Sequence, residues 1–199
     1  MSAARWVESQ VRPYADMIAI VEATDRASFE RAVDVAYQRI LRWFEGARAD
    51  WRRVHERVLS RTIAGKFDES VPALPEYELN GPVDVVVFHP DHPDWIHLAE
   101  CKKWGGLQTQ LDAMQQLRRR GTPDVKRGLV VMFFVDRATP AAAFWEDVKR
   151  DLFTDGDVQR PLGPLGAVPW LADAFQSEHV GGFGGNFAIV HLPCDLVGA

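Results

Sequence analysis

The feature that most constrains this chain is an uninterrupted apolar run, LVVMFFV, at Leu129–Val135. A strand that does not alternate between polar and apolar residues is buried on both faces, so other elements must cover both sides of its sheet. Apolar residues at three- and four-residue steps predict such covering helices at 29–44 and 107–120. The sequence therefore predicts an α/β fold in which helices flank a mixed sheet.

Two further helices are expected around this core. Asp50 can cap a helix that runs from Trp51 to about Ile63 and ends at Gly65. A second is expected to open at Thr139-Pro140 and to carry Phe144, Val148 and Leu152 on its apolar side. The first helix, 29–44, is followed by Gly46 as a stop signal.

Strand patterns and turn residues predict two consecutive hairpins. A possible strand at 71–79, interrupted by prolines, precedes the turn Asn80-Gly81-Pro82 and the β-rich run 83–88. HPDHPD, at 89–94, cannot continue that strand, and an extended pattern resumes at 95–102. The histidines and aspartates of HPDHPD resemble a metal cluster, but turn geometry explains them better.

The 199 residues are expected to form one domain. We divide it into an N-terminal helical extension at 1–49, a core at 50–152, and a segment at 153–199 rich in glycine and proline that ends in a strand at 186–192. Neither a membrane-spanning run nor a signal peptide is recognisable, which favours a cytoplasmic protein without a membrane partner. Its two cysteines are too few for a disulfide scaffold or a zinc site.

Three charged residues on the second hairpin form the candidate site. Residues two apart on a strand share a face, so Glu100 and Lys102 project together, and Asp84 on the preceding strand can face them. Two converging carboxylates suit Mg²⁺ or Mn²⁺, and the backbone carbonyl of Cys101 could add a ligand. Such a cation can polarise a phosphodiester and acidify water, while Lys102 orients the water or offsets developing charge.

These residues resemble the PD-(D/E)XK nuclease superfamily. Asp84 follows Val83, and Glu100-Cys101-Lys102 supplies the second half of the motif, with the proline displaced to Pro82. The context GPVDVVVF, IHLAECKKW, MQQL and LVVMFF is similar to small bacterial members over about residues 50–152. The resemblance implies a restriction-endonuclease-like fold with an αβββαβ core, an extra N-terminal helix and a C-terminal strand. It also implies Asp84 and Glu100 as metal ligands and Lys102 as the catalytic lysine.

The resemblance adds two less certain site residues. Gln116 in MQQL matches a glutamine that supports the active site in related nucleases, and Glu56 matches a helix carboxylate that precedes the core. On a helical wheel, however, Gln116 falls opposite Leu107, whereas Gln110 flanks the apolar stripe, so either glutamine could belong to the site. Glu56 could instead pair with nearby arginines on a solvated helix face.

Basic residues near the motif could bind the substrate. Lys103, Arg118, Arg119 and Arg120, with the arginines of the helix after Asp50, could contact the phosphates of a nucleic acid, or could simply be solubilising charge. The net charge of −5 argues against non-specific coating of nucleic acid. A homodimer or a targeting partner protein is an additional expectation.

The function predicted from sequence is a Mg²⁺-dependent nuclease, most simply a DNA endonuclease in restriction, repair or phage defence. One alternative is a non-catalytic module on the same scaffold that binds a nucleic acid or a protein, because fold does not fix function. Another is a metal-dependent phosphoesterase acting on a nucleotide.

Overall fold

A seven-stranded mixed sheet organises the molecule, with strand order β1-β2-β3-β4-β7-β6-β5. The computed structural model describes residues 15–136 and 166–197. Its β3 and β4 are parallel, as are β4 and β7, while the other neighbours are antiparallel. The strands are β1 (Ala73–Glu78), β2 (Pro82–Phe88), β3 (Ile96–Lys103), β4 (Arg127–Phe134), β5 (Gly166–Ala167), β6 (Phe175–Val180) and β7 (Asn186–Asp195).

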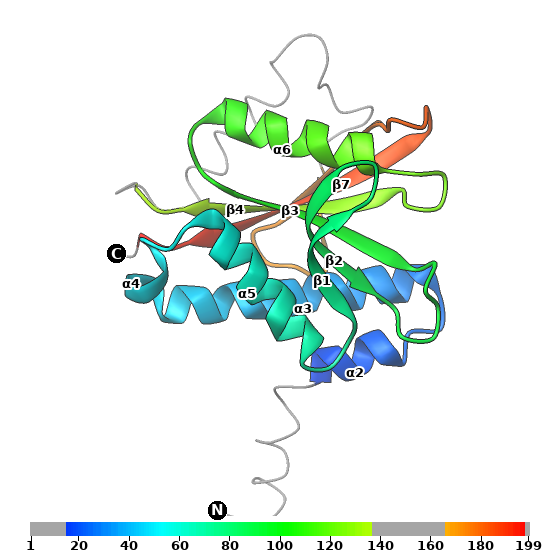
Figure 1. Ribbon diagram of the computed structural model, residues 1–199, viewed down its shortest axis with the longest axis horizontal. Helices are drawn as coiled ribbons and strands as arrows, with labels where there is room; N and C mark the ends of the chain where they lie inside the picture. Colours follow the sequence, from blue (N-terminus) through cyan, green and yellow to red (C-terminus); the bar gives the residue numbers. More distant parts are fainter. Residues whose placement is uncertain (1–14, 137–165, 198–199) are drawn as a thin grey trace, which may run out of the picture.

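Helices cover both faces of this sheet, as Figure 1 shows. One face carries α3 and α5, and the opposite face carries α6. The described helices are α2 (Ala15–Val21), α3 (Arg26–Gly46), α4 (Arg48–Trp51), α5 (Glu56–Asp68) and α6 (Leu107–Arg120). None of them is long and apolar enough to cross a membrane.

The predicted order of elements is confirmed from α5 to β4. These elements run helix, three strands, helix, strand, and β4 is buried along its whole length, as its uninterrupted apolar sequence predicts. Asn80 and Gly81 both have positive φ, at 52° and 116°, in the turn of the β1–β2 hairpin. Asparagine and glycine tolerate this conformation best, which is why the sequence gives such a clear turn signal.

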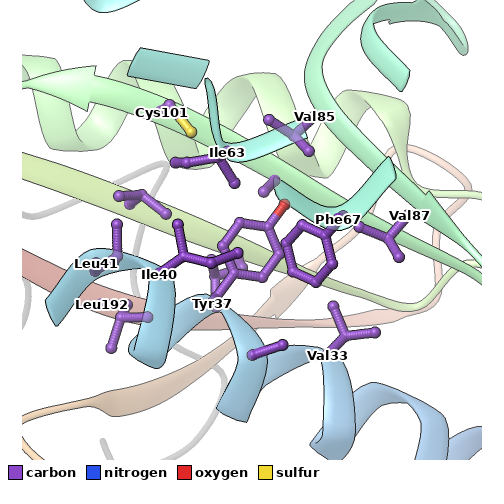
Figure 2. Close-up of a cluster of buried hydrophobic side chains, with 14 of the residues drawn as sticks. Val33, Tyr37, Ile40, Leu41, Ile63, Phe67, Val85, Val87, Cys101 and Leu192 are labelled. Carbon is purple, nitrogen blue, oxygen red and sulfur yellow. The ribbon is translucent and has the colours of Figure 1, made fainter. Parts of the chain in front are cut away.

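The core beneath α3 and α5 is built around one large aromatic residue, Tyr37. Its ring centroid lies 4.8 Å from that of Phe67 on α5, and Val85, Val87 and Leu192 of the sheet belong to the same cluster (Figure 2). Since each fully buried aliphatic or aromatic side chain contributes about 1.5–3 kcal/mol, this layer fixes α5 against the first three strands. The N-terminus of α5 is thereby held at the edge of the sheet.

A buried ion pair also ties α3 to the sheet. Arg127 on β4 pairs with both carboxylate oxygens of Asp34, and His97 Nε2 lies 3.2 Å from Asp34 Oδ1. Burial raises the pKa of Asp34, but hydrogen bonds and charge from His97 and Arg127 outweigh it, so the net pKa lies below its usual value. His97 is therefore a buried, hydrogen-bonded residue, and it lies on the face of β3 opposite to Glu100.

Two boundaries differ from the sequence prediction. The helix expected from Trp51 is broken: α4 ends at Trp51, and α5 begins at Glu56 after His55, whose Nδ1 accepts from Arg57 N–H at 3.2 Å. Gly65 does not end this helix, which continues to Asp68. Hydrophobic contacts of Phe67 with the core outweigh the weak helix preference of glycine.

The C-terminal segment contributes more to the sheet than expected. The expected last strand is confirmed as β7, but β7 lies inside the sheet between β4 and β6. Strands β5 and β6 lie in the stretch rich in glycine and proline, for which no strand was predicted before residue 186. The helix expected after Thr139-Pro140, with Phe144, Val148 and Leu152, lies outside the described residues.

Candidate active site

Asp84 and Glu100 face each other where the pairing of two antiparallel strands ends. The β2–β3 ladder runs from Phe88 and Ile96 to Val85 and Ala99. Beyond the last paired residues, a side chain replaces the backbone as hydrogen-bond acceptor. Asp84 Oδ2 accepts a hydrogen bond from the backbone N–H of Cys101 at 2.9 Å. This bond holds the carboxylate against β3, at the same edge of the sheet as Glu100.

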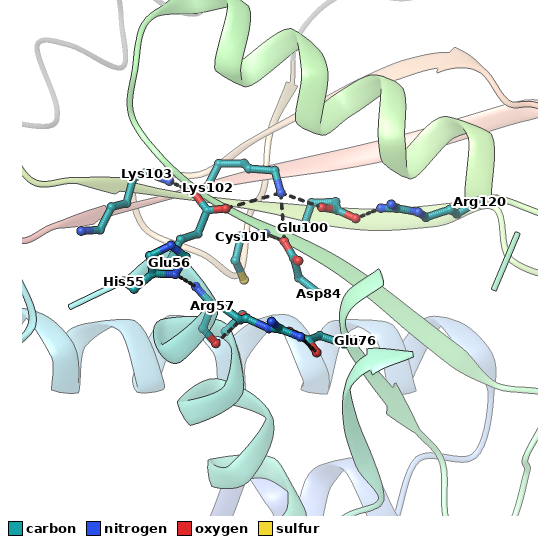
Figure 3. A network of polar contacts seen from close by, with 11 residues as sticks. His55, Glu56, Arg57, Glu76, Asp84, Glu100, Cys101, Lys102, Lys103 and Arg120 are labelled. Atoms are coloured by element: carbon teal, nitrogen blue, oxygen red, sulfur yellow. Dashed lines mark hydrogen bonds and ion pairs between the residues drawn. The ribbon is translucent and has the colours of Figure 1, made fainter. Parts of the chain in front are cut away.

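The ammonium of Lys102 lies at the centre of three carboxylates. Its Nζ is 3.2 Å from Asp84 Oδ2, 3.2 Å from Glu100 Oε2 and 3.7 Å from Glu56 Oε1. Figure 3 shows these contacts from β2, β3 and α5 meeting at one point. The predicted convergence of two acids and one lysine is therefore present, and Glu56 joins it.

Glu100 is almost completely buried, with 1% of its side chain exposed. Its Oε1 forms an ion pair with Arg120 at the end of α6, which leaves Oε2 for Lys102 (Figure 3). Burial lowers the pKa of the Arg120 guanidinium. Arg120 was predicted either to contact phosphate or to be solubilising surface charge, but its side chain is only 10% exposed. It orients Glu100 instead, because a buried carboxylate needs a partner charge.

Glu56 reaches the site because α5 begins there. Its Oε2 accepts the backbone N–H of Lys103 at 2.7 Å, while Oε1 faces Lys102. A carboxylate in the first turn of a helix is also favoured by the helix dipole. The resemblance described above gave Glu56 only as a less certain site residue, and in the structure its Oε1 lies 3.7 Å from Lys102 Nζ.

The donor set fits a hard divalent cation. Within the described residues, no three acidic, histidine or cysteine side chains are grouped closely enough to hold a metal ion as they stand. Mg²⁺ needs fewer, because it keeps several waters and commonly binds one or two carboxylates. Asp84 Oδ2 and Glu100 Oε2 meet that need, since both already converge on one positive charge. The predicted contribution of the Cys101 carbonyl stays a prediction.

The two candidate glutamines on α6 lie in different surroundings. Gln116 is half-buried and makes none of the contacts that join the charged cluster. Gln110 is fully buried, and its Nε2 lies 2.8 Å from His191 Nδ1 on β7. Gln110 is thus engaged two strands away from Glu100, and a supporting role of Gln116 remains a prediction.

His191 belongs to a buried polar chain that the sequence did not reveal. Ser177 Oγ lies 2.7 Å from His191 Nε2 and 2.7 Å from His179 Nε2. Since a hydroxyl donates one hydrogen, one imidazole donates to Ser177 and the other accepts. Burial lowers the pKa of His179 to about 4 and holds the pKa of His191 well below its usual value, so both rings are neutral at pH 7.

The other basic residues lie on two sides of the cluster. Arg119 is exposed on α6, while Arg118 Nε donates to the carbonyl of Val180 at 2.8 Å. The side chain of Lys103 points away from Glu100, and its Nζ lies 3.4 Å from the carbonyl oxygen of Arg52 (Figure 3). Phosphate binding by Lys103, Arg118 and Arg119 stays a prediction.

Comparison with protein-family models, with curated proteins and with solved structures gives no match for this chain.

Proposed function

We propose that this protein is a Mg²⁺- or Mn²⁺-dependent nuclease that hydrolyses phosphodiester bonds, with DNA as its principal substrate. The observation that carries the proposal is the meeting of Asp84, Glu100 and Glu56 on the ammonium of Lys102. Three carboxylates against Lys102 and Arg120 leave an excess of negative charge in a partly buried place, and such an excess favours a functional role as a cation site.

Each residue has a distinct task in the proposed reaction. Asp84 and Glu100 Oε2 hold the cation, while Arg120 keeps Glu100 Oε1 and so fixes the direction of the other oxygen. When bound, the cation neutralises phosphate charge and acidifies a water molecule. Lys102 offsets the negative charge that develops on the phosphodiester, and Glu56 lies near enough to hold Lys102 or the attacking water.

The setting of the site supports the same proposal. The order α5-β1-β2-β3-α6-β4 and the position of the acids on β2 and β3 agree with a restriction-endonuclease-like, PD-(D/E)XK arrangement. We therefore place the protein, as part of the proposal, among cytoplasmic DNA endonucleases of restriction, repair or phage defence. A second copy or a partner protein would supply part of its targeting.

A cleavage assay tests the proposal. Plasmid and oligonucleotide DNA are incubated with the wild-type protein in Mg²⁺, in Mn²⁺ and in EDTA. Cleavage is expected with either metal, to stop in EDTA and to be lost in Asp84→Asn. The matched control is Glu69→Gln, because Glu69 forms an ordinary exposed ion pair with Lys66 at 3.3 Å. Metal-independent cleavage, or equal cleavage by Asp84→Asn, would overturn the proposal.

One observation favours a non-catalytic module as the second candidate. Both carboxylate oxygens of Glu100 already form ion pairs, one with Lys102 and one with Arg120. The charged cluster is therefore also stable as a purely structural network. In that case the protein binds a nucleic acid or another protein, but it binds no metal ion and cleaves no phosphodiester bond. Calorimetric titration with Mn²⁺ separates the two: heat of binding that disappears in Asp84→Asn favours the nuclease, and no heat in the wild type favours the module.

A further inference from the structure

A polar hollow opens next to the charged cluster, at the ends of the parallel strands β3 and β4. It has a volume of about 730 Å³, and three basic side chains line it: Arg52, Arg53 and Lys103. Trp104 forms another part of its wall and also lines an adjoining hollow of about 240 Å³ beside Gly105 and Gly106. The two hollows together offer positive charge and an aromatic surface in one place.

Lys103 lines the hollow and also contacts Glu56 of the candidate active site. The backbone N–H of Lys103 donates to Glu56 Oε2, and its side chain reaches over to the carbonyl oxygen of Arg52. Lys102 and Lys103 are consecutive on a strand, so their side chains point to opposite faces. The Glu56 carboxylate nevertheless contacts both residues, through Oε1 to the Lys102 ammonium and through Oε2 to the Lys103 N–H, so the hollow lies beside the charged cluster.

The basic residues of the hollow are arranged rather than scattered. Arg52 Nε donates to the carbonyl of Val135 at 2.7 Å, which fixes its guanidinium at the rim. Arg53 is exposed, and among the described residues that line the hollow Asp136 is the single acidic one. The described lining residues carry three positive charges and one negative charge, so the hollow is locally positive although the whole chain has a net charge of −5.

The aromatic wall restricts which nucleic acid fits. Trp104 is half-buried, its backbone N–H donates to the carbonyl of Phe133 at 2.8 Å, and its ring packs 5.4 Å from that of Phe134. A base can stack on an indole only when it is unpaired or has been turned out of a duplex. Pockets of roughly 300–1,000 Å³ hold single small ligands, and this hollow has room for a nucleotide but not for a double helix.

We propose that this hollow is a binding subsite for one unpaired nucleotide of a single-stranded or frayed nucleic acid, next to the scissile phosphate. The phosphate lies on Arg53 and Lys103, and the base lies against Trp104. The subsite rests on the proposed nuclease function for its position in the reaction, and its binding chemistry can be tested without cleavage. It makes the protein selective for unpaired strands over duplex.

Binding is measured by fluorescence anisotropy with a labelled 12-nucleotide DNA strand in EDTA, so that cleavage does not interfere. We expect Trp104→Leu to weaken binding about tenfold or more, as for loss of one base-stacking contact, and Trp104→Phe to restore most of it. Arg53→Gln should lower the slope of log K against log salt by about 0.7, the value for one phosphate contact on a single strand. The duplex of the same sequence should bind more weakly.

Matched controls lie elsewhere on the chain. Trp43→Leu replaces a tryptophan exposed on α3, and Arg39→Gln replaces an arginine of α3 that forms an ion pair with Asp16. Both should bind the strand as the wild type does. If Arg53→Gln keeps the wild-type salt slope, or the duplex binds as tightly as the single strand, the subsite is refuted, even when the wild type cleaves DNA. A mononucleotide that binds as tightly as the 12-mer also refutes it.

The two proposals fail separately. Strand binding that depends on Trp104 and Arg53, without any Mg²⁺-dependent cleavage, supports the subsite and rejects the nuclease. Cleavage that is lost in Asp84→Asn, with strand binding indifferent to Trp104 and Arg53, supports the nuclease and rejects the subsite.

Discussion

Replacing Lys102 with methionine is expected to tighten the binding of a divalent cation and at the same time to abolish cleavage. The ammonium lies 3.2 Å from both Asp84 Oδ2 and Glu100 Oε2, the two oxygens proposed to hold the cation. Ammonium and cation therefore compete for the same place. Methionine keeps the length of the side chain and removes its charge.

The size of the effect follows from the distances. Two unit charges about 4 Å apart interact by about 1 kcal/mol in surroundings as polar as water, and a divalent cation doubles this to about 2 kcal/mol. The Lys102 side chain is 18% exposed, so the value for water is a lower bound. Removing this repulsion corresponds to about a thirtyfold lower Kd, since each 1.4 kcal/mol is a factor of ten.

Isothermal titration with Mn²⁺ measures the effect in four proteins: wild type, Lys102→Met, Lys102→Arg and the control Lys66→Met. The arginine variant keeps the charge and should stay near the wild-type Kd, as should the control, whose lysine pairs with Glu69 at the surface. Cleavage is measured on the same preparations. A Kd for Lys102→Met that is unchanged or higher than that of the wild type would refute the competition between ammonium and cation.

Three further outcomes are expected from equilibrium unfolding in urea. Glu100→Gln should lower the free energy of unfolding by about 3–5 kcal/mol, because Arg120 is left buried without its partner charge. The double variant Glu100→Gln with Arg120→Met should recover much of this stability. Equal stability of the single and the double variant would contradict the prediction. Asp34→Asn should lower the free energy of unfolding by a similar amount, because Arg127 then loses its buried partner charge. A loss under 1 kcal/mol would show that this ion pair does not stabilise the fold. The pKa of His179 is about 4 in the folded state and about 6.5 in the unfolded state, so the unfolded state binds more protons between pH 4 and pH 6.5. The free energy of unfolding should therefore fall as the pH drops from 6.5 to 4. In His179→Gln this dependence on pH should be weaker.

The parts of the fold that sequence predicts well are those where one local signal is strong. Strand β4 is apolar throughout, and the Asn80-Gly81 turn requires residues that accept positive φ. Helix α6 has an apolar stripe and is followed by Gly121. In each case the local preference agrees with the final packing, so periodicity and turn chemistry are sufficient.

Strand β6 escaped prediction because its buried side is not apolar. Its inward positions are Phe175, Ser177 and His179, and only the first gives a hydrophobic signal with a period of two. The two polar residues are acceptable there because they bond to each other, and Ser177 also bonds to His191 on β7. That second contact depends on the pairing of β6 with β7, which the residues of β6 alone do not reveal.

The site was predictable in its strand residues and less so in its helix residues. Alternation along β3 fixes the common face of Glu100 and Lys102 without any knowledge of the rest of the fold. The inward direction of Arg120 depends on how α6 docks, although its spacing of three residues from Leu117 already places it beside the apolar stripe. Glu56 depends on where α5 starts, and the break between α4 and α5 left no clear signal in the sequence.

The measurement that tests the central claim most directly is anomalous diffraction from crystals soaked in Mn²⁺. The account predicts one strong peak between the carboxylates of Asp84 and Glu100, with Lys102 Nζ moved out of the position it shares with them and Arg120 still paired with Glu100. Crystals that bind Mn²⁺ only elsewhere, or that keep the ammonium in contact with both carboxylates at saturating metal, would contradict it.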